Sequence, residues 1–383
     1  MSFRPSSLKI GILGAGQLGK MMAQEASRLD IELHFLDKSK DYPAGKLSRF
    51  FTEGDFKDFD SVMSFGRDLD VLGIEIEDVN VDALEFLEKV GKRIIPHPSV
   101  LRIVQDKGNQ KQFFRAQGYP TASFFCFESA DSVREAINSG LIKLPFVQKS
   151  RKGGYDGKGV VVIKQESDIH LLLDTACVVE EMADILKELS VIVASDSNGH
   201  RLTYPCVEME FHPEANLVEY LLCPAQIPQE VSEAASLLAL QIANDLDVQG
   251  LLAVEMFWNR DGKIWVNELA PRPHNSGHHT LDNGACSQFF NQVCALAGLP
   301  LGPVESDLYA IMLNLVGEEG HSGLVRYEGL EECLALEGVH IHLYGKAETR
   351  PHRKMGHVCI TDRHLEKCRD KANFVRNKLK VLS

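Results

Sequence analysis

Two glutamates expected to face each other on a β-hairpin constrain this chain more than any other feature. Two strand-like segments, residues 251–259 and 264–272, are separated by Asp261-Gly262, a strong signal for a two-residue hairpin loop. The register that this loop sets places Glu255 directly opposite Glu268. Their predicted neighbours on the same face are all apolar: Leu251, Ala253, Phe257, Ile264, Val266 and Ala270.

Such a pair of glutamates needs a partner of opposite charge. Like charges directly opposite each other destabilise a sheet, and burying unpaired carboxylates costs more. Magnesium that holds nucleotide phosphates is typically bound by one or two carboxylates. The hairpin therefore predicts an ATP–magnesium site with Glu255 and Glu268 as metal ligands. The alternative is an edge hairpin whose glutamates are solvated.

The composition is that of an ordinary globular protein. With 383 residues, of which 44% are hydrophobic, the chain is long enough for two or three domains. Its net charge of −13 argues against nucleic acid as a partner. The nine cysteines form no C-x-x-C pair, which favours reduced thiols in the cytosol. No signal peptide or membrane span is evident, so we expect a cytoplasmic protein that binds no membrane.

The first hundred residues predict a doubly wound α/β domain. A strand at Leu8–Leu13 is followed by the glycine-rich turn Gly14–Gly19, a helix, and a second strand that ends at Asp37. The turn matches G-x-G-x-x-G, and Asp37 stands where a ribose-binding acid would, so a nicotinamide-dependent dehydrogenase is one alternative. The same turn also serves to pack a helix on a strand or to hold a phosphate.

A second glycine-rich segment, Gly153–Gly159, lies between two predicted strands and does not open a helix as a Walker loop does. A hairpin loop of this kind can fold over a nucleotide, with backbone N–H groups facing phosphate oxygens. Lys149 on the preceding strand is placed to reach the same phosphates. The alternative, a plain surface hairpin, explains the glycines but not the Tyr155-Asp156 pair among them.

The apolar strand before Glu180–Ala183 ends in a segment that can present backbone groups to an adenine edge. Glu188 is then the candidate acid for the ribose hydroxyls. A plain strand exit explains the segment equally well.

The segment that leaves the hairpin, residues 267–278, is dense in functional residue types. Arg272 offers a planar fork suited to a carbonate or phosphate anion, and His274 and Asn275 add a proton carrier and an amide. Strict alternation places Asn267 on the face opposite Glu268, so metal binding by both requires a twist or a bulge.

Near the C-terminus, Lys346 and the run 350–354 form a compact basic cluster. In an acidic protein such a cluster suggests a site for a phosphate monoester. A solvated run of charges is the alternative.

Together these segments resemble the N5-carboxyaminoimidazole ribonucleotide synthetase family of the ATP-grasp superfamily. The matching motifs, in the family's order, are G-A-G-Q-L-G-K-M at 14–21, E-I-E-D-V at 75–79, G-G-Y-D-G-K-G at 153–159, N-E-L-A-P-R-P-H-N-S-G-H at 267–278 and R-P-H-R-K-M-G-H at 350–357. The chain departs from the family pattern at Gly73-Ile74, where members commonly have Thr-Tyr or a similar pair. It also departs at Glu208–His212, which is one residue longer.

The resemblance implies an ATP-grasp fold of mixed α/β and α+β type. Residues 1–98 would form a Rossmann-like domain similar to the biotin carboxylase N-terminal domain. Residues 99–300 would form the ATP-grasp domain, with a lid at about 120–185, and residues 301–383 a small C-terminal α+β domain. The family is usually homodimeric.

The resemblance also implies roles for individual residues. ATP would be held by Lys107, Lys149, Gly154, Tyr155, Asp156, Gly157, Lys158, Gly159, Val160, Glu180, Glu181, Met182, Ala183, Glu188, His212, Asn267 and Glu268. Magnesium would be held by Glu255 and Glu268. Aminoimidazole ribonucleotide would lie against Gln17, Leu18, Glu75, Tyr155, Arg272, Lys346, Arg353 and Lys354. The catalytic residues would be Lys149 together with Arg272, His274 and Asn275, the last three handling bicarbonate.

The activity implied is the carboxylation of the 5-amino group of aminoimidazole ribonucleotide through carboxyphosphate, driven by ATP with bicarbonate as co-substrate, in de novo purine biosynthesis. Another ATP-grasp ligase, such as the formate-dependent glycinamide ribonucleotide transformylase, is a closer alternative than the dehydrogenase. A non-catalytic nucleotide-binding module is a third alternative, and the full set of charged site residues argues against it.

Overall fold

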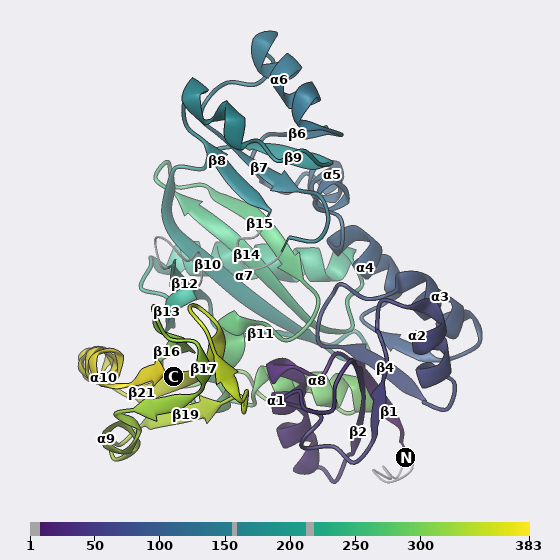
Figure 1. Ribbon diagram of the computed structural model, residues 1–383, viewed down its shortest axis with the longest axis vertical. Coiled ribbons are helices and arrows are strands. Elements are labelled where there is room, and N and C mark those ends of the chain that lie inside the picture. The colour runs from purple at the N-terminus through teal and green to yellow at the C-terminus, as the bar shows by residue number, and fades with distance from the viewer. Residues whose placement is uncertain (1–7, 155–158, 212–217) are drawn as a thin grey trace.

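The structure, a computed structural model, describes residues 8–154, 159–211 and 218–383. Figure 1 shows a central sheet with a small lid above it, the N-terminal domain at the lower right and a C-terminal layer at the lower left. Within the described residues, no helix combines the length and the apolar character needed to cross a membrane.

The N-terminal domain is a doubly wound parallel sheet, as predicted. Its strands are β1 (Ile10–Leu13), β2 (Leu33–Asp37), β3 (Phe51–Glu53), β4 (Val71–Ile74) and β5 (Arg93–Ile95). Its helices are α1 (Gln17–Ser27), α2 (Phe59–Gly66) and α3 (Val81–Lys89). The strand order is β3-β2-β1-β4-β5. Strands β1 and β4 are buried along their whole length, which is why they consist of continuous apolar runs.

One face of this parallel sheet is completed by a helix from much later in the chain. Helix α8 (Gln288–Ala297) packs on α1, and its buried Phe289, Val293 and Leu296 join the apolar core around β1. A Cβ atom at Gly73 would lie only 2.8 Å from Leu296 Cδ2. A larger residue at this departure from the family pattern would therefore require the Leu296 side chain to move.

The central sheet is antiparallel and contains the predicted hairpin. Its strands, in spatial order, are β15 (Ile264–Ala270), β14 (Gly250–Asn259), β10 (Ile185–Ser195), β12 (Val207–Phe211), β13 (Val218–Cys223), β16 (Tyr309–Val316), β21 (Lys354–Asp362) and β19 (Val339–Leu343), with β11 (Arg201–Thr203) paired to β10. The helices α4 (Pro98–Val104), α5 (Lys107–Gln117) and α7 (Gln229–Asp245) pack on one face of the hairpin end, where Val191, Val254 and Val266 are buried. On the opposite face Leu251, Ala253 and Ala270 belong to a second apolar cluster, and polar side chains follow nearer the turn.

The lid is a small antiparallel sheet with its own apolar core. It consists of β6 (Phe124–Phe127), α6 (Ala130–Asn138), β7 (Phe146–Ser150), β8 (Val160–Ile163), the 3₁₀ helix η2 (Glu166–Leu171) and β9 (Cys177–Glu181). The strand order is β6-β9-β7-β8. The predicted glycine-rich segment joins β7 to β8, so it connects two strands as expected.

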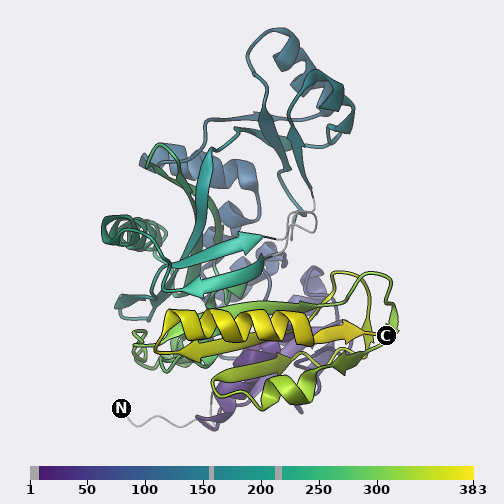
Figure 2. The same ribbon diagram turned by 90° about the vertical axis from the view of Figure 1, so that its left-hand side faces the viewer.

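The C-terminal layer extends the central sheet and does not stand apart from it, because β16 pairs with β13. Besides β16, β19 and β21 it contains β17 (Gly323–Leu324), β18 (Arg326–Glu328), α9 (Leu330–Leu334), β20 (Glu348–Thr349), α10 (Leu365–Lys378) and β22 (Lys380–Leu382). Figure 2 shows α10 lying across the face of this layer. The division into three domains stays a prediction, since one sheet joins strands from both sides of residue 300.

The packing of α8 can be tested by truncating Phe289, which is fully buried. Phe289→Ala should lower the free energy of unfolding by about 3–5 kcal/mol, because it leaves a cavity between α8 and the parallel sheet. Urea unfolding followed by circular dichroism would measure the loss. Phe374→Ala on α10, where the phenylalanine is 38% exposed, is the control and should cost much less. Equal losses would contradict the role assigned to α8.

Candidate active site

The hairpin brings the two predicted glutamates together by a route that differs from the prediction. Strands β14 and β15 pair Glu255 with Glu268, as expected. Nearer the turn, Trp258 pairs with Ile264, so the loop holds three residues, 260–262, and the predicted two-residue loop is wrong. The glycine of this loop has φ +85°, the left-handed conformation that such three-residue loops require.

A β-bulge at Asn267 compensates for the longer loop. The two glutamates pair with each other whereas Met256 pairs with Val266, which leaves Asn267 as the extra residue on β15. Metal binding by both Asn267 and Glu268 requires a twist or a bulge, and this bulge is present in the structure. It also reverses the faces of the residues before it: Ile264 and Val266 pack into the core beneath the sheet, and their predicted place beside the glutamates is wrong.

Each glutamate of the pair is in contact with a nitrogen-bearing side chain. Lys107 Nζ at the start of α5 forms an ion pair with Glu268, and His274 Nε2 lies 3.2 Å from Glu255 Oε1. Although burial acts to raise it, the pKa of Glu255 is held below its ordinary value by the hydrogen bond with His274. Burial and the charge of Glu255 together raise the pKa of Glu188, on the adjacent strand β10, to about 7. Three carboxylates thus converge on one face of the sheet.

Lys149 reaches this face from the lid. Its Nζ lies 2.9 Å from Asn267 Oδ1 and 3.2 Å from Glu180 Oε1. Lys111 Nζ lies 3.0 Å from the other oxygen of Glu180, and burial lowers the pKa of this lysine to about 8. The Glu180 side chain is therefore committed to two lysines, and a nucleotide contact at this residue is left to its backbone.

Arg272 is fixed by Glu77, which comes from the segment after β4. The guanidinium group makes two contacts with the carboxylate, one of them 3.2 Å long between Nη2 and Oε1. Despite burial, the Arg272 charge lowers the pKa of Glu77 to about 2. This pair joins the N-terminal domain to the loop that leaves the hairpin.

The same loop orients His274 and Asn275. His274 Nδ1 contacts Ser276 Oγ at 2.9 Å, which leaves Nε2 to face Glu255. The Gln288 side chain bonds the backbone of His274 twice, at 2.8 Å to its N–H and at 2.6 Å to its carbonyl oxygen. Asn275 Nδ2 is buried without a hydrogen-bond partner among the described residues, so it can donate to a ligand.

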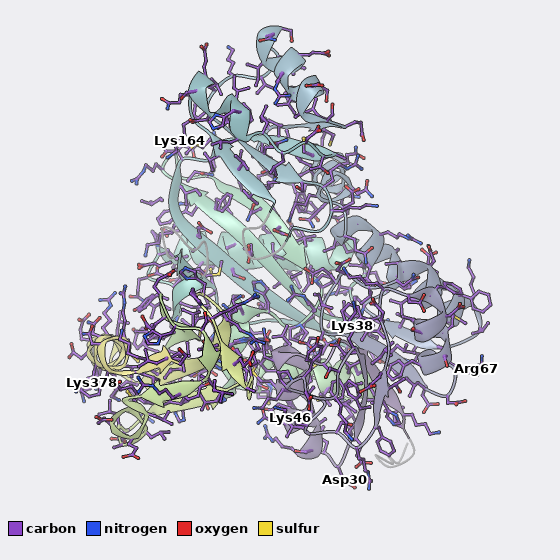
Figure 3. All side chains as sticks on the ribbon, in the orientation of Figure 1. Asp30, Lys38, Lys46, Arg67, Lys164 and Lys378 are labelled. Carbon is purple, nitrogen blue, oxygen red and sulfur yellow. The ribbon has the colours of Figure 1, made fainter. Side chains whose placement is uncertain are left out.

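A cleft of about 780 Å³ lies between the N-terminal domain and the C-terminal layer. It is lined by the glycine-rich turn of residues 14–16 and by Glu75, Lys346 and Arg353, which the sequence assigns to one substrate. Lys46 also lines it and donates to the carbonyl oxygen of Gly345 at 2.9 Å; Figure 3 shows this lysine at the boundary between the two parts. The structure therefore brings together the basic cluster and the N-terminal turn.

Glu75 lies at the floor of this cleft, against the first turn of α1. Its carboxylate accepts a hydrogen bond from the backbone N–H of Gly16, and a Cβ atom on Gly16 would lie 2.3 Å from Glu75 Oε1. Burial raises the pKa of Glu75 to about 7. Gln17 and Leu18, also predicted to contact substrate, form the start of α1 beside this carboxylate.

The other residues predicted for the site lie on several different elements. Lys354, at the start of β21, accepts a 2.6 Å bond from Lys346 Nζ through its carbonyl oxygen. Gly154 and Val160 flank the glycine-rich segment, and Gly159 has φ +74°. Glu181, Met182 and Ala183 follow the buried part of β9, the first two being exposed. The predicted Tyr155, Asp156, Gly157, Lys158 and His212 lie outside the described residues.

The ribose-binding role considered for Asp37 does not fit its surroundings. Asp37 is 7% exposed, and its oxygens accept backbone N–H bonds from Ala15 at 2.8 Å and Lys38 at 2.7 Å. The carboxylate thus stabilises the glycine-rich turn itself, which argues against the dehydrogenase alternative.

Three residues of this site carried no role in the sequence prediction. Glu77 lies inside the matching motif at 75–79, and that position is the signal that could have identified it. Lys111 follows Lys107 by one helical turn, so its position on the same helix face could also have been predicted from the sequence. Nothing local indicates Gln288, because its two bonds to the His274 backbone form only once α8 packs against the loop.

Comparison with known proteins identifies relatives along the whole chain. Three family models match: a ribonucleotide synthetase preATP-grasp domain at residues 7–105, an ATP-grasp domain at 112–289 and a phosphoribosylaminoimidazole carboxylase C-terminal domain at 310–371. The N5-carboxyaminoimidazole ribonucleotide synthase of Bacillus subtilis is 36% identical over 354 residues, covering 91% of this chain and 90% of that protein.

Solved structures agree. The N5-carboxyaminoimidazole ribonucleotide synthetase of Thermotoga maritima superposes with a TM-score of 0.89 at 38% identity, covering 98% of this chain and 99% of that one. An N5-carboxyaminoimidazole synthase of Aspergillus clavatus, solved with ADP and 5-aminoimidazole ribonucleotide, gives 0.88 at 30% identity, covering 97% and 98%.

The raised pKa of Glu75 predicts a pH dependence of stability. Between its ordinary pKa of 4.5 and about 7 the folded state keeps this proton while the unfolded state loses it. The contribution of Glu75 to the free energy of unfolding therefore falls as the pH rises through this range, by about 3 kcal/mol in total. Glu75→Gln removes the effect. Urea unfolding at about pH 5 and pH 8 should show the wild type losing more stability than the variant, and parallel losses would contradict it.

Proposed function

This chain belongs to the N5-carboxyaminoimidazole ribonucleotide synthase family, and we propose that the glutamate pair on its central sheet and the cleft beside Glu75 form one active site. It is an ATP-grasp ligase that forms a C–N bond. It carboxylates aminoimidazole ribonucleotide at the expense of ATP, in purine biosynthesis. The observation that carries the assignment of residues is the Glu255–Glu268 pair opposite Lys149, because this set suits the triphosphate of a nucleotide.

The nucleotide lies between the lid and the central sheet. Lys107 and Lys149 neutralise its phosphates, Glu188 takes the ribose hydroxyls, and the backbone at 180–183 meets the adenine edge. The segment 154–160 stays the predicted cover of the phosphates, and four of its residues lie outside the described part of the chain.

The residues present fit a magnesium ion. Glu255 and Glu268 are directly opposite on the sheet, Asn267 is the bulge residue next to Glu268, and His274 and Lys107 contact the two carboxylates. Oxygen ligands of this kind are the ones that magnesium prefers. When bound, the ion would neutralise charge that develops on the transferred phosphoryl group.

The reaction begins when a bicarbonate oxygen attacks the γ-phosphorus of ATP in line, forming carboxyphosphate as the bond to ADP breaks. Lys149 stabilises the charge on the phosphoryl oxygens, while Arg272 and Asn275 hold bicarbonate through its oxygens. Glu77 keeps the Arg272 fork in place for this contact. The lid excludes water, which would otherwise hydrolyse the activated intermediate.

Carboxyphosphate then breaks into carbon dioxide and phosphate within the closed site. The 5-amino group of the ribonucleotide forms a C–N bond to carbon dioxide and loses one proton, giving the carbamate. The two bases at hand for that proton are an oxygen of the released phosphate and His274, whose ring is oriented by Ser276 and Glu255.

Aminoimidazole ribonucleotide occupies the cleft beside Glu75. Lys346 and Arg353 face the cleft from the C-terminal layer and suit a phosphate monoester, while Glu75 and the start of α1 approach from the other side. Gln17 and Leu18 begin α1, and the Lys354 carbonyl oxygen accepts the bond from Lys346 Nζ. Tyr155, also predicted for this substrate, lies outside the described residues.

Three further points stay predictions: magnesium as the metal, a homodimer as the assembly and the cytoplasm as the location. The formate-dependent transformylase alternative is not favoured, since the C-terminal segment matches the phosphoribosylaminoimidazole carboxylase model.

The first experiment measures ADP release with ATP, magnesium and bicarbonate, with and without aminoimidazole ribonucleotide. Strong stimulation by the ribonucleotide, together with a labile carbamate product, is the expected result. Stimulation by a different acceptor would keep the ATP-grasp fold and overturn the substrate. Absence of ATP turnover under every condition would overturn the site.

Glu268→Gln tests the metal ligand. The variant keeps the size of the side chain but removes its charge, so kcat should fall by about 100-fold or more. Glu233→Gln on the exposed face of α7 is the control and should leave kcat unchanged. Near-normal turnover of the Glu268 variant would rule out the assignment.

Arg353→Ala tests the phosphate site. Loss of a charge-assisted bond should raise KM for aminoimidazole ribonucleotide by about 10- to 100-fold, while KM for ATP stays near its wild-type value. Arg363→Ala, at an exposed position after β21, is the matched control. If KM for ATP rose instead, the basic cluster would belong to the nucleotide.

A further inference from the structure

A group of metal-binding side chains lies in the C-terminal layer, on the paired strands β19 and β21. His342 on β19 is directly opposite His357 on β21, and the next pair on the same face is His340 with Cys359. Side chains two residues apart on a strand share a face, so H-x-H on one strand meets H-x-C on its neighbour. None of these residues has a role in the mechanism above.

The ligand atoms of His342, His357 and Cys359 all lie within 4.8 Å of one another. His357 and Cys359 are fully buried. His357 Nδ1 contacts Tyr344 Oη at 3.0 Å, and its Nε2 has no hydrogen-bond partner within the described ranges. His342 Nε2 is taken by Asp282 Oδ2 at 2.7 Å, so its Nδ1 is the nitrogen left for a ligand.

We propose that His342, His357 and Cys359 form a site for a zinc-like transition-metal ion, with Asp282 as the carboxylate that orients His342. Two imidazoles and a thiolate are the ligands of such ions, whereas magnesium and calcium prefer oxygen. A ligating histidine usually donates its second N–H to a carboxylate, which is the relation between His342 and Asp282. Three protein ligands leave a fourth position for water.

Binding requires two local changes. The rings of His342 and His357 are stacked, 9° from parallel, with centroids 4.5 Å apart. Each nitrogen lone pair lies in its ring plane, so a shared ion requires one ring to turn. His342, whose side chain is 26% exposed, is the ring with room to do so. The ion also replaces the proton of Cys359, whose thiol now contacts the carbonyl oxygen of His278 at 3.4 Å.

The site would tie the C-terminal layer to the loop after the hairpin. Asp282 directly follows the 3₁₀ helix η3 (Asn275–Leu281), which begins beside His274. Within η3, the ring of His278 lies 4.7 Å from that of His357. A bound ion would therefore fix β19 and β21, which border the basic cluster, against the segment that carries His274 and Asn275.

The test uses the full-length chain in buffer with excess magnesium, with Zn²⁺ and Co²⁺ as probes. Equilibrium dialysis should show about one Zn²⁺ retained per chain, as a three-ligand site predicts. Co²⁺ should give a thiolate-to-metal absorption band in the near ultraviolet and strong visible bands of a four-coordinate ion. Cys359→Ser should abolish the thiolate band.

Two further variants separate a metal site from general effects. Asp282→Asn should weaken Zn²⁺ binding by about 10- to 100-fold, as loss of a carboxylate behind a ligating histidine does. Cys333→Ser, a buried cysteine on α9, is the matched control and should keep both the stoichiometry and the band. A wild-type chain that retains no Zn²⁺ and gives no thiolate band would overturn the site whether or not the variants fold. A band that persists in Cys359→Ser would overturn it as well.

Discussion

Two like charges placed side by side on one sheet face are the constraint on which the rest of the site depends. Glu255 and Glu268 are tolerated because Lys107 and His274 reach them from two different segments, α5 and the loop after β15. The bulge at Asn267 lets the core side chains of β15 face inward while the polar ones face the site. One extra residue in the ladder thus serves both the packing below the sheet and the chemistry above it.

Charge balance extends outward from this pair. Glu180 forms ion pairs with both Lys111 and Lys149, and Glu77 fixes Arg272, so most buried charges of the described site have a partner of opposite sign before any substrate arrives. Removing one member of a buried pair typically costs about 3–5 kcal/mol, because the other is left uncompensated. When a nucleotide binds with its cation, its phosphates can instead replace the glutamates as partners of the lysines, and the cation can replace the lysines as partner of the glutamates. The site is therefore arranged in advance, and the protein alone keeps it stable.

Much of this arrangement could be predicted from local sequence, and the failures have physical causes. The glutamate pair followed from strand alternation and a turn signal. The loop length and the bulge depend instead on the packing of Ile264 and Val266 into the core on one face of the sheet. The predicted loop was too short and the predicted ladder lacked the bulge, and the two errors cancelled. The doubly wound domain followed from its apolar runs. The contribution of α8 did not, because Leu296 meets Gly73 only after folding.

The packing of α8 on the N-terminal sheet has a consequence for how the chain can be divided into fragments. A fragment ending near residue 98 would lack the helix that covers one face of its sheet. A fragment ending near residue 300 would leave β13 as a free edge, open to pairing with another chain. Cutting the chain near either predicted boundary would therefore expose a surface that the intact protein covers. Motif order along the chain overstates how modular the molecule is: in space it behaves as one interlocked unit.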